Sequence, residues 1–404
     1  MIDFSPHLPK RPQTDPQYVP ELVECMLSTA RERGASDLHL VPTASGLEMK
    51  WRIDGVLQSV RTFPSEIAPR VVARLKILSQ LLTYQSDMPQ EGRIREPTGN
   101  VEMRVSTFPT LFGEKAVVRM FVGSGKFRML DELGLAPEIL DRLRLALAGT
   151  SGLILLAGPA GSGKTTTVYA SLRELVDKSG AGRSLVSLED PIEAVVEGVS
   201  QSQVNIAAGF TLDAGLRSLV RQDPEVLLVG EIRDRATAEI VFQAALTGHL
   251  VLTTFHAGSA AGAIGRLSDM GIEPYLLRSG LRTIVCQRLV RKLCHCATPL
   301  QEVSETGSVE AEQMGLRVKA LRTARGCNDC QQTGYRGRMV LAEMLQPEAT
   351  DLGRAILSRG DTAELHAQAE QAGMVSLEQR GIAAVEAGLT TPAEIRRVLG
   401  MFEG

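Results

Sequence analysis

Long apolar runs are missing from this sequence of 404 residues. No stretch approaches the ~20 consecutive apolar residues that cross a bilayer, and the first residues lack the apolar core of a signal peptide. An excess of basic residues is missing too. Lys and Arg total 44 against 47 Asp and Glu, and the net charge of −3 gives no general attraction to nucleic acid or anionic lipid. We therefore expect a cytoplasmic protein without a nucleic-acid partner.

Cysteine is scarce, with six residues in the whole chain. In a cytoplasmic protein of this length, so few thiols favour metal ligands or buried side chains over disulfides. Internal repeats and low-complexity blocks are absent as well. Hydrophobic residues make up 44% and charged residues 23% of the chain, as in ordinary soluble proteins. The length suits about two or three domains, each with its own core.

The stretch from Gly152 to Leu172 reads GLILLAGPAGSGKTTTVYASL. An apolar run, a glycine-rich turn, Gly-Lys-Thr and a helix-compatible segment follow one another, as in a P-loop. Glycines let backbone N–H groups turn toward phosphates, and the next helix points its positive end at them. We expect Lys164 to reach the β- and γ-phosphates of ATP and Thr165 to hold Mg²⁺; the alternative is a loop that merely joins a strand to a helix. The predicted nucleotide site is Gly158, Pro159, Ala160, Gly161, Ser162, Gly163, Lys164, Thr165 and Thr166.

Further apolar runs follow the P-loop strand at Ser184–Asp190, Val226–Ile232 and His249–His256. Separated by helical stretches, they predict a largely parallel sheet covered by helices on both faces. Before the P-loop, helical spacing over Glu21–Arg33 and alternation over Leu47–Asp54 predict a small α+β domain.

These patterns set the expected domain boundaries. They are a flexible proline-rich lead-in over 1–20, the α+β domain over 21–122, a glycine hinge over 123–126, the P-loop domain over 127–345 with a cysteine-rich insertion over 291–338, and a helical C-terminal region over 346–404. Thr391-Pro392-Ala393-Glu394 predicts a capping box at the start of the last helix. Cys25 and Cys286 lie in stretches that we interpret as helical and buried.

Several blocks together resemble one family. They are GASDLHL with WRIDG, the P-loop, SLEDPIE (Ser187–Glu193), LVRQDPEVLLVGEIRD (Leu219–Asp234), TGHLVLTTFHA (Thr247–Ala257) and GCNDCQQTGYRGRMVLAEML (Gly326–Leu345). From Glu21 to its end the chain resembles the GspE/PilB-like secretion ATPases of type II secretion and type IV pilus assembly. The resemblance implies a RecA-like ATPase domain after a PAS-like α+β domain. It also implies ATP and Mg²⁺ as ligands, a homo-hexamer, and an inner-membrane platform protein as partner, so that the motor is peripherally associated with the inner membrane.

The chain departs from the family pattern in three places. Ala160 stands where the usual P-loop has Thr, and Cys294-His295-Cys296 is one residue tighter than the usual CxxC. Longer family members carry an additional amino-terminal domain that docks on the platform, whereas this sequence begins just before GASDLHL. The route by which the motor is recruited is therefore open.

The resemblance also assigns catalytic roles. Glu193 corresponds to the family's catalytic glutamate, and a carboxylate at a strand end beside the P-loop can deprotonate water. The alternative is that the acids of this box only cap the next helix. Gly230 occupies the place of a common aspartate, so Glu231 becomes the acid nearest Mg²⁺, through the waters of the ion. His256 is expected to sense the γ-phosphate.

Arginines of the first domain complete the expected site. By resemblance, Arg93, Arg104 and Arg119 neutralise phosphate charge as arginine fingers do; the alternative is that they are solvated strand residues. His249 stays open between a site role and a structural role, and we expect His39 to be structural.

Four cysteines form a pair-and-pair arrangement, Cys294, Cys296, Cys327 and Cys330. Four thiolates suit a tetrahedral structural Zn²⁺. One intervening residue strains chelation by the first pair, so His295 could replace one thiol. The alternative is buried or disordered thiols.

We therefore expect a cytoplasmic hexameric ATPase whose domain closure drives pilus or pseudopilus assembly. The nearest alternative is a pilus-retraction motor, but such relatives lack the cysteine pairs. A conjugation-type ATPase fits GASDLHL and TGYRGR poorly. An adaptor that binds nucleotide without hydrolysis is disfavoured by the intact Lys164, Glu193 and Glu231.

Overall fold

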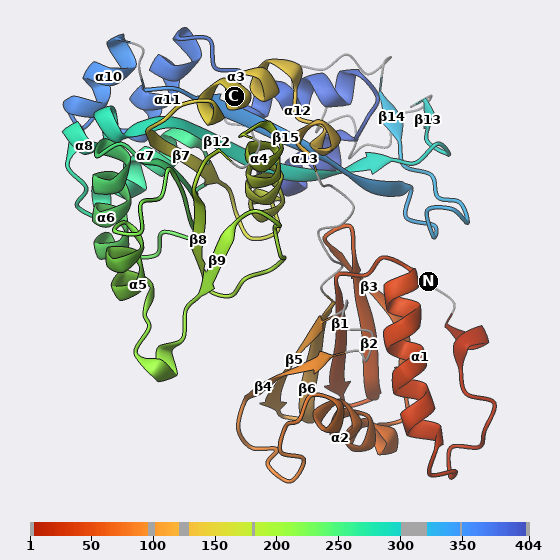
Figure 1. Cartoon of the computed structure of the whole chain (residues 1–404). Helices are drawn as coiled ribbons and strands as arrows, with labels where there is room; N and C mark the ends of the chain where they lie inside the picture. Colours follow the sequence, from red (N-terminus) through yellow and green to blue (C-terminus); the bar gives the residue numbers. More distant parts are fainter. Residues whose placement is uncertain are drawn as a thin grey trace. The chain divides into compact units, whose positions relative to one another are not determined.

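The computed structural model describes residues 4–95, 102–120, 129–179, 182–299, 321–347 and 350–400. The chain divides into two compact units, Met1–Gly125 with Arg325–Arg336, and Lys126–Ala324 with Gly337–Gly404 (Figure 1). The hinge predicted over 123–126 lies outside the described residues. Among the described helices, none has the length and apolar content that a bilayer span requires.

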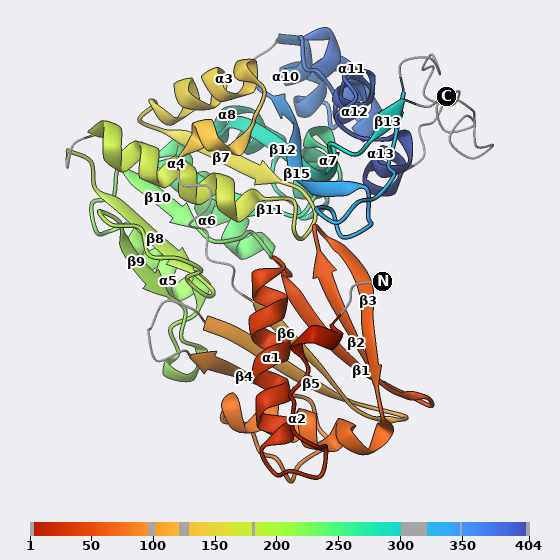
Figure 2. The same ribbon diagram turned by 90° about the vertical axis from the view of Figure 1, so that its right-hand side faces the viewer.

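The first unit is an antiparallel sheet backed by two helices. Its described strands have the order β3-β2-β1-β6-β5-β4. Helices α1 and α2 cover one face of this sheet, as Figure 2 shows. Leu38, Trp51 and Val118 lie opposite one another on three strands and belong to the same core as Leu22 of α1 and Val71 of α2. The elements are η1 (Ser5–His7), α1 (Tyr18–Glu32), β1 (Asp37–Thr43), β2 (Gly46–Ile53), β3 (Val56–Phe63), η2 (Ser65–Ile67), α2 (Ala68–Leu78), β4 (Gln90–Arg95), β5 (Glu102–Thr110) and β6 (Gly113–Met120).

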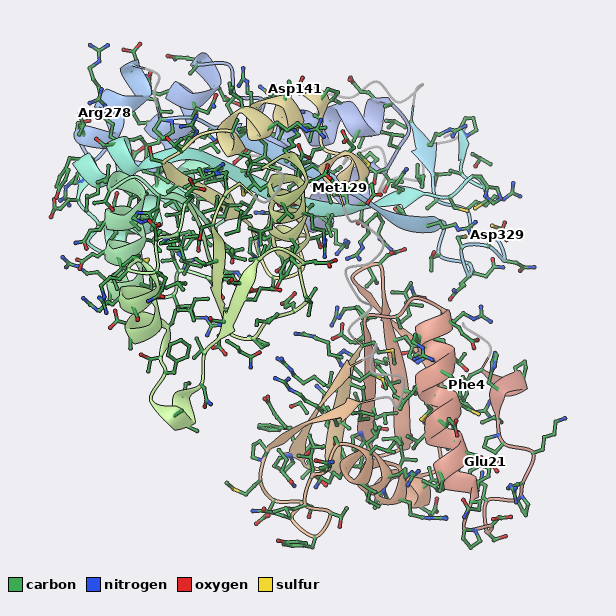
Figure 3. The ribbon with its side chains drawn as sticks, viewed as in Figure 1. Phe4, Glu21, Met129, Asp141, Arg278 and Asp329 are labelled. Atoms are coloured by element: carbon green, nitrogen blue, oxygen red, sulfur yellow. The ribbon has the colours of Figure 1, made fainter. Side chains whose placement is uncertain are left out.

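The lead-in predicted as flexible is partly packed against this unit. Phe4, labelled in Figure 3, is 1% exposed, and its ring centroid lies 6.0 Å from that of Trp51 and 6.3 Å from that of Phe63. Helix α1 begins at Tyr18, inside the predicted lead-in. The structure differs from the prediction because one large aromatic side chain buries enough apolar surface to hold a proline-rich segment.

The second unit is an α/β layer, which confirms the predicted fold class. Its sheet has the order β15-β12-β7-β11-β10-β8-β9, and neighbours from β12 to β9 pair in parallel. The elements are η4 (Leu130–Leu133), α3 (Pro137–Leu147), β7 (Gly152–Ala157), α4 (Lys164–Ser179), β8 (Leu185–Glu189), β9 (Ser200–Gln203), η5 (Ile206–Ala208), α5 (Leu212–Leu219), β10 (Val226–Val229), α6 (Arg235–Leu246), β11 (Leu250–Phe255), α7 (Ala260–Asp269), α8 (Pro274–Gly280), β12 (Leu281–Leu293), β13 (Thr298–Pro299), β14 (Arg322–Thr323), β15 (Tyr335–Leu345), α10 (Thr350–Leu357), α11 (Thr362–Gln371), α12 (Leu377–Glu386) and α13 (Pro392–Leu399).

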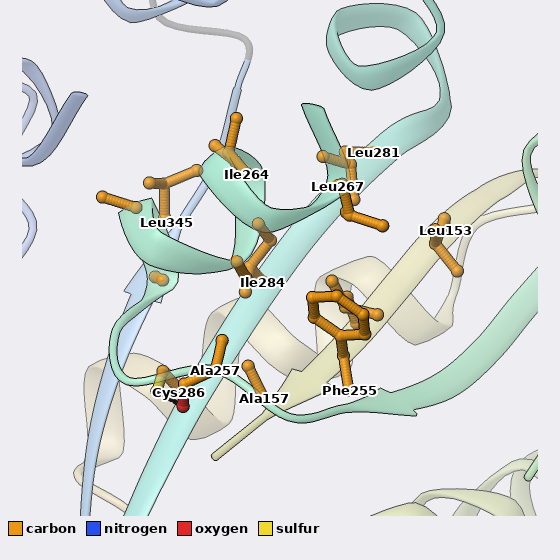
Figure 4. Close-up of a cluster of buried hydrophobic side chains, with 14 of the residues drawn as sticks. Leu153, Ala157, Phe255, Ala257, Ile264, Leu267, Leu281, Ile284, Cys286 and Leu345 are labelled. Carbon is orange, nitrogen blue, oxygen red and sulfur yellow. Dashed lines mark hydrogen bonds between the residues drawn. The ribbon is translucent and has the colours of Figure 1, made fainter. Parts of the chain in front are cut away.

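Strand β7 is buried on both faces of this sheet. Leu153 and Ala157 belong to a core that includes Phe255 of β11 and Leu267 of α7, as Figure 4 shows. The intervening Ile154 belongs to a second core, with residues of α3 and α4. Helices on both faces explain why the sequence of β7 is continuously apolar rather than alternating.

The C-terminal helices share the first of these cores. Ile356 of α10 and Ile395 of α13 pack in the same cluster as Leu153. Glu343 of β15 is 1% exposed, and its carboxylate accepts hydrogen bonds from the backbone N–H of Ala260 (2.6 Å) and of Leu377 (3.0 Å). These N–H groups open α7 and α12, so one buried carboxylate caps two helices.

Two local predictions need correction. Cys286 is buried as predicted but lies on strand β12, not on a helix. Thr391 caps α13 by accepting a hydrogen bond from Glu394 N (3.2 Å), which is half of the predicted capping box. The carboxylate of Glu394, however, accepts hydrogen bonds from Arg291 (2.7 Å) and Arg397 (2.6 Å). Charged donors form stronger hydrogen bonds than a backbone N–H, and they hold this carboxylate.

Candidate active site

The loop between β7 and α4 has a backbone shape that requires glycine. Gly158, Gly161 and Gly163 have φ of 145°, 75° and 94°, where other residues are strained. A Cβ on Gly158 would lie 2.4 Å from Ser162 Oγ and 2.6 Å from the backbone O of Gln287. Ser162 Oγ is buried and has no hydrogen-bond partner among the described residues. The loop therefore holds an unused hydroxyl at the positive end of α4, which fits an anionic ligand.

Lys164, the first residue of α4, folds its side chain back over this loop. Its ammonium donates hydrogen bonds to the carbonyls of Gly158 (2.8 Å) and Pro159 (2.9 Å). Burial lowers the pKa of Lys164, while the negative charge of Glu231 acts in the opposite direction. Because both of these acceptors are carbonyls, they leave the positive charge un-neutralised, and a phosphate can replace them.

The acids of SLEDPIE point in different directions. Glu189 is buried at the end of β8 and accepts a hydrogen bond from the Ser187 hydroxyl (2.6 Å). Asp190, joined to Pro191 by a cis peptide bond, pairs with Arg233 (3.4 Å). Glu193 is exposed in the loop that follows. Asp190 and Glu193 are both exposed beyond the end of β8, whereas Glu189 is buried within the strand.

Glu231 lies just after β10 and is held by two side chains. One carboxylate oxygen is 3.0 Å from His256 Nε2, and the other is 3.2 Å from Arg233 Nε. The carbonyl of Gly230 accepts a hydrogen bond from the Thr254 hydroxyl (2.8 Å), which ties the end of β10 to that of β11. The structure thus brings together Glu231 and His256, which the sequence places on separate segments.

The P-loop, Glu193, Glu231 and His256 all follow the carboxyl ends of parallel strands, β7, β8, β10 and β11. In parallel α/β sheets this edge is where ligands bind. The order β7-β11-β10-β8 places His256 between the P-loop and the two carboxylates along that edge. These residues therefore form one candidate site within the second unit.

Two other histidines lie outside this site. His249 precedes β11, at the opposite edge of the sheet, and its Nδ1 is 3.0 Å from the backbone O of Ala244. His39 lies on β1 of the first unit, where burial, followed by the charge of Arg52, lowers its pKa. Its Nε2 is buried without a partner among the described residues. Both positions are those of structural side chains.

The arginines of the first unit form a row across its sheet. Arg93 is opposite Arg104, Arg104 opposite Arg119, Arg119 opposite Asp37, and Asp37 opposite Arg52. Directly opposite residues share a face of the sheet. Asp37 pairs with Arg119 (3.2 Å) and Arg52 (3.4 Å). Three guanidinium groups thus lie next to one another on one face of the sheet, and Asp37 neutralises part of the charge of Arg119.

The four predicted cysteines form a cluster. The sulfur atoms of Cys294, Cys296, Cys327 and Cys330 all lie within 4.8 Å of one another, and the four cysteines lie outside disulfides. The backbone N–H groups of Cys327 (3.1 Å) and Gly334 (3.2 Å) donate to Cys330 Sγ. Four convergent sulfurs supported by backbone donors fit a tetrahedral zinc site. His295, 3.6 Å from Cys294 Sγ, is not required as a substitute ligand.

The sequence did not single out Arg233, Asp37 or Tyr169. Arg233 contacts both Asp190 and Glu231, and Asp37 anchors the arginine row. Tyr169 lies in the helix-compatible part of the P-loop stretch, but its hydroxyl contacts Glu189 and Glu193. Asp37 lies in GASDLHL and Arg233 in LVRQDPEVLLVGEIRD, so both had a sequence signal, whereas Tyr169 had none beyond its place in the P-loop stretch.

Comparison with known proteins shows which family and which solved structures this chain resembles. The family described as type II/IV secretion system protein matches residues 12–397. Type II secretion system protein E of Pectobacterium carotovorum subsp. carotovorum is 40% identical over 380 residues, which cover 93% of this chain and 75% of that protein. The type IV pilus assembly ATPase TfpB of Acinetobacter baylyi is 36% identical over 399 residues, covering 96% and 67%. The solved structure of the Legionella pneumophila ATPase DotB has the same fold, with a TM-score of 0.67 at 21% identity, covering 96% of this chain and 97% of that one.

Proposed function

Because the chain belongs to the type II/IV secretion system protein family, we propose that it is a P-loop ATPase whose ATP hydrolysis powers pseudopilus or type IV pilus assembly. The observation that carries the proposal is the shared sheet edge of the glycine loop, Lys164, Glu193, Glu231 and His256. The names of the two relatives, a type II secretion protein and a pilus assembly ATPase, support the same process.

In this proposal the loop Gly158–Thr166 binds the phosphates of ATP. Lys164 leaves the carbonyls of Gly158 and Pro159 and donates to the β- and γ-phosphates. Thr165 and, through water, Glu231 hold Mg²⁺, which neutralises part of the phosphate charge when it is bound.

Hydrolysis requires a base for the attacking water. Glu193 is an exposed carboxylate of its box, and we assign it to take the proton of the water. His256 senses the γ-phosphate. Its Nε2 lies 3.0 Å from a carboxylate oxygen of Glu231, so His256 connects the γ-phosphate to the residue that we assign to Mg²⁺. Buried Glu189 and arginine-paired Asp190 are less suited to be the base.

Arg104 and Arg119 supply further positive charge to the γ-phosphate when the first unit closes. The shared face of Arg93, Arg104 and Arg119 supports this role, since guanidinium groups on one face can meet the same phosphate group. Closure is favoured while the γ-phosphate is present and is lost after its release, which is the difference in affinity that a ligand-driven change requires. We place the hinge for this closure at 123–126, between domains over 21–122 and 127–345. We also propose that the chain assembles as a homo-hexamer.

The remaining assignments follow from the family. The motor acts in the cytoplasm and associates with the inner membrane through a platform protein. Without an excess of basic residues, the chain has no general attraction to nucleic acid.

The direct test is phosphate release from ATP by the purified full chain. Release is expected with Mg²⁺ and is expected to stop when EDTA removes it, because the P-loop holds nucleotide and metal together. A chain that binds ATP at Kd comparable to other P-loop proteins but releases no phosphate would instead be a nucleotide-binding adaptor.

A second expectation concerns zinc. Protein purified without chelator should contain about one zinc per chain, measured by mass spectrometry of the metal, because one tetrahedral site uses all four sulfurs. Cys327→Ser should lower both the zinc content and the thermal unfolding midpoint, since structural zinc contributes folding energy. Cys25→Ser, which alters a half-buried thiol of α1, is the control and should keep the metal. Folded, active protein with far less than one zinc would show the four cysteines to be thiols only.

A further inference from the structure

Tyr169 connects the P-loop helix to the loop that carries Glu193. Its hydroxyl donates to the buried carboxylate of Glu189 and accepts a hydrogen bond from the backbone N–H of Glu193 (3.1 Å). Burial, together with the hydrogen bond to Glu189, raises the pKa of Tyr169 well above its usual range, so the hydroxyl keeps its proton. One hydroxyl thus joins a fixed acid in the core to the backbone of an exposed acid.

Two glutamines of β9 hold the same loop at other points. Gln201 donates to the carbonyl of Ala194 (3.0 Å) and accepts from the N–H of Val196 (2.7 Å). Gln203 accepts from the N–H of Ile192 (3.2 Å). A loop without regular structure is therefore bound through its backbone on both sides of Glu193, by side chains that belong to regular elements.

The opposite end of this connection is the phosphate loop. Tyr169 follows Lys164 by five positions in the sequence, or about 7.5 Å along the axis of α4. Tyr169 is 1% exposed and lies in the core formed by α3, α4 and the sheet. Because a packed helix moves as a rigid element, a shift of its first turn on nucleotide binding is transmitted to the Tyr169 hydroxyl.

We propose that Tyr169, assisted by Gln201 and Gln203, is a positioning residue that sets Glu193 in line with the attacking water when the P-loop is filled. This inference rests on the proposed function of the site. Tyr169 acts through the backbone of Glu193, whose N–H donates to its hydroxyl. A misplacement of about 1 Å is enough to cost about 100-fold in rate.

Tyr169→Phe tests the proposal because it removes the hydroxyl and keeps the buried ring. We expect kcat for ATP hydrolysis to fall about 10- to 100-fold, while KM for ATP changes less than about threefold, since the P-loop itself is unaltered. Tyr275→Phe, which removes the hydroxyl of an exposed tyrosine on α8, is the matched control and should keep both constants.

A double variant separates positioning from general damage to the fold. Tyr169→Phe is then combined with Glu193→Gln, and the hydrolysis rate is measured in single-turnover experiments with labelled ATP. If Tyr169 acts only through Glu193, the double variant should be less than about twofold slower than Glu193→Gln, because residues that act together have non-additive effects. A further loss of the full 10-fold or more would overturn the proposal, as would wild-type kcat for Tyr169→Phe. If Tyr169→Phe does not fold, Gln203→Ala decides: kcat reduced at constant KM supports positioning, and unchanged kcat contradicts it. Absence of turnover in the wild-type chain would refute the proposed function instead.

Discussion

Arg104→Ala is expected to lower ATP turnover by about 100-fold or more while nucleotide binding persists. Arg104 is the middle member of the arginine row, opposite Arg93 on one side and Arg119 on the other. An arginine that meets transferring phosphate charge contributes about 10³–10⁵ in kcat in other P-loop enzymes. We expect a smaller loss because two neighbouring guanidinium groups remain. Binding through the P-loop needs no residue of the first unit, so the Kd for ATP should change little.

The control for this loss is Arg70→Ala. Arg70 is exposed on α2, on the helical side of the same sheet, and donates to the backbone O of Gln13 (3.3 Å). It carries the same charge as Arg104 but lies off the row, so its removal should leave turnover near wild type. Equal turnover by Arg104→Ala and the wild-type chain would show Arg104 to be a solvated strand residue.

Mixing variants determines whether Arg104 serves its own chain. Arg104→Ala subunits retain a complete P-loop, and Lys164→Ala subunits retain the arginine row. If each site takes its arginine from a neighbouring chain, mixtures should regain turnover that neither variant shows alone. If Arg104 acts within its own chain, the turnover of a mixture should equal the sum of the turnovers of the two variants measured separately.

Glu193→Gln is expected to lower kcat by about 10²–10⁴-fold, the range of general base catalysis, and to leave ATP bound. The amide keeps the shape of the side chain but cannot take a proton from water. Turnover is measured as released phosphate, and binding as the affinity for a fluorescent ATP analogue. Because the backbone N–H of Glu193 still donates to Tyr169 (3.1 Å), the loop should stay in place.

Asp190→Asn is the matched variant, since it neutralises another acid of the same box. Asp190 pairs with Arg233 (3.4 Å), and we expect only a few-fold change in kcat. Glu231→Gln should weaken the dependence on Mg²⁺, because we propose that Glu231 holds this ion through water. If Glu193→Gln keeps its turnover and Glu231→Gln loses it, Glu231 is the base.

Local chemistry accounts for what could be predicted from the sequence. The P-loop was predictable because φ values above 0° at Gly158, Gly161 and Gly163 require glycine and depend on adjacent residues alone. The parallel sheet was predictable because strands buried on both faces must be apolar throughout. Cysteine spacing likewise brought the four cysteines into one predicted cluster, which the structure contains.

Features that depend on distant residues were not predictable. The arginine row exists only because three strands pair in one register, and a shift of one residue would move an arginine to the other face. In the sequence, Tyr169 is one residue of a helix-compatible segment. Its contacts with Glu189 and Glu193 depend on the fold, which brings these distant residues to its hydroxyl. The carboxylate of Glu394 was predicted to accept a hydrogen bond within the capping box. It accepts one from Arg291 instead, which is distant in the sequence.

The buried carboxylate of Glu343 has a consequence for how the second unit melts. Its two carboxylate oxygens accept hydrogen bonds from the first turns of two helices. One is α7, which follows His256 in the chain, and the other is α12, one of the C-terminal helices. Detaching the C-terminal helices would strip one of two charged hydrogen bonds, worth about 1.5–3 kcal/mol each, and would open the core that holds Leu153 of the P-loop strand. We therefore expect the C-terminal helices and the sheet that carries the phosphate loop to unfold together, and we expect removal of the helices after β15 to weaken β7.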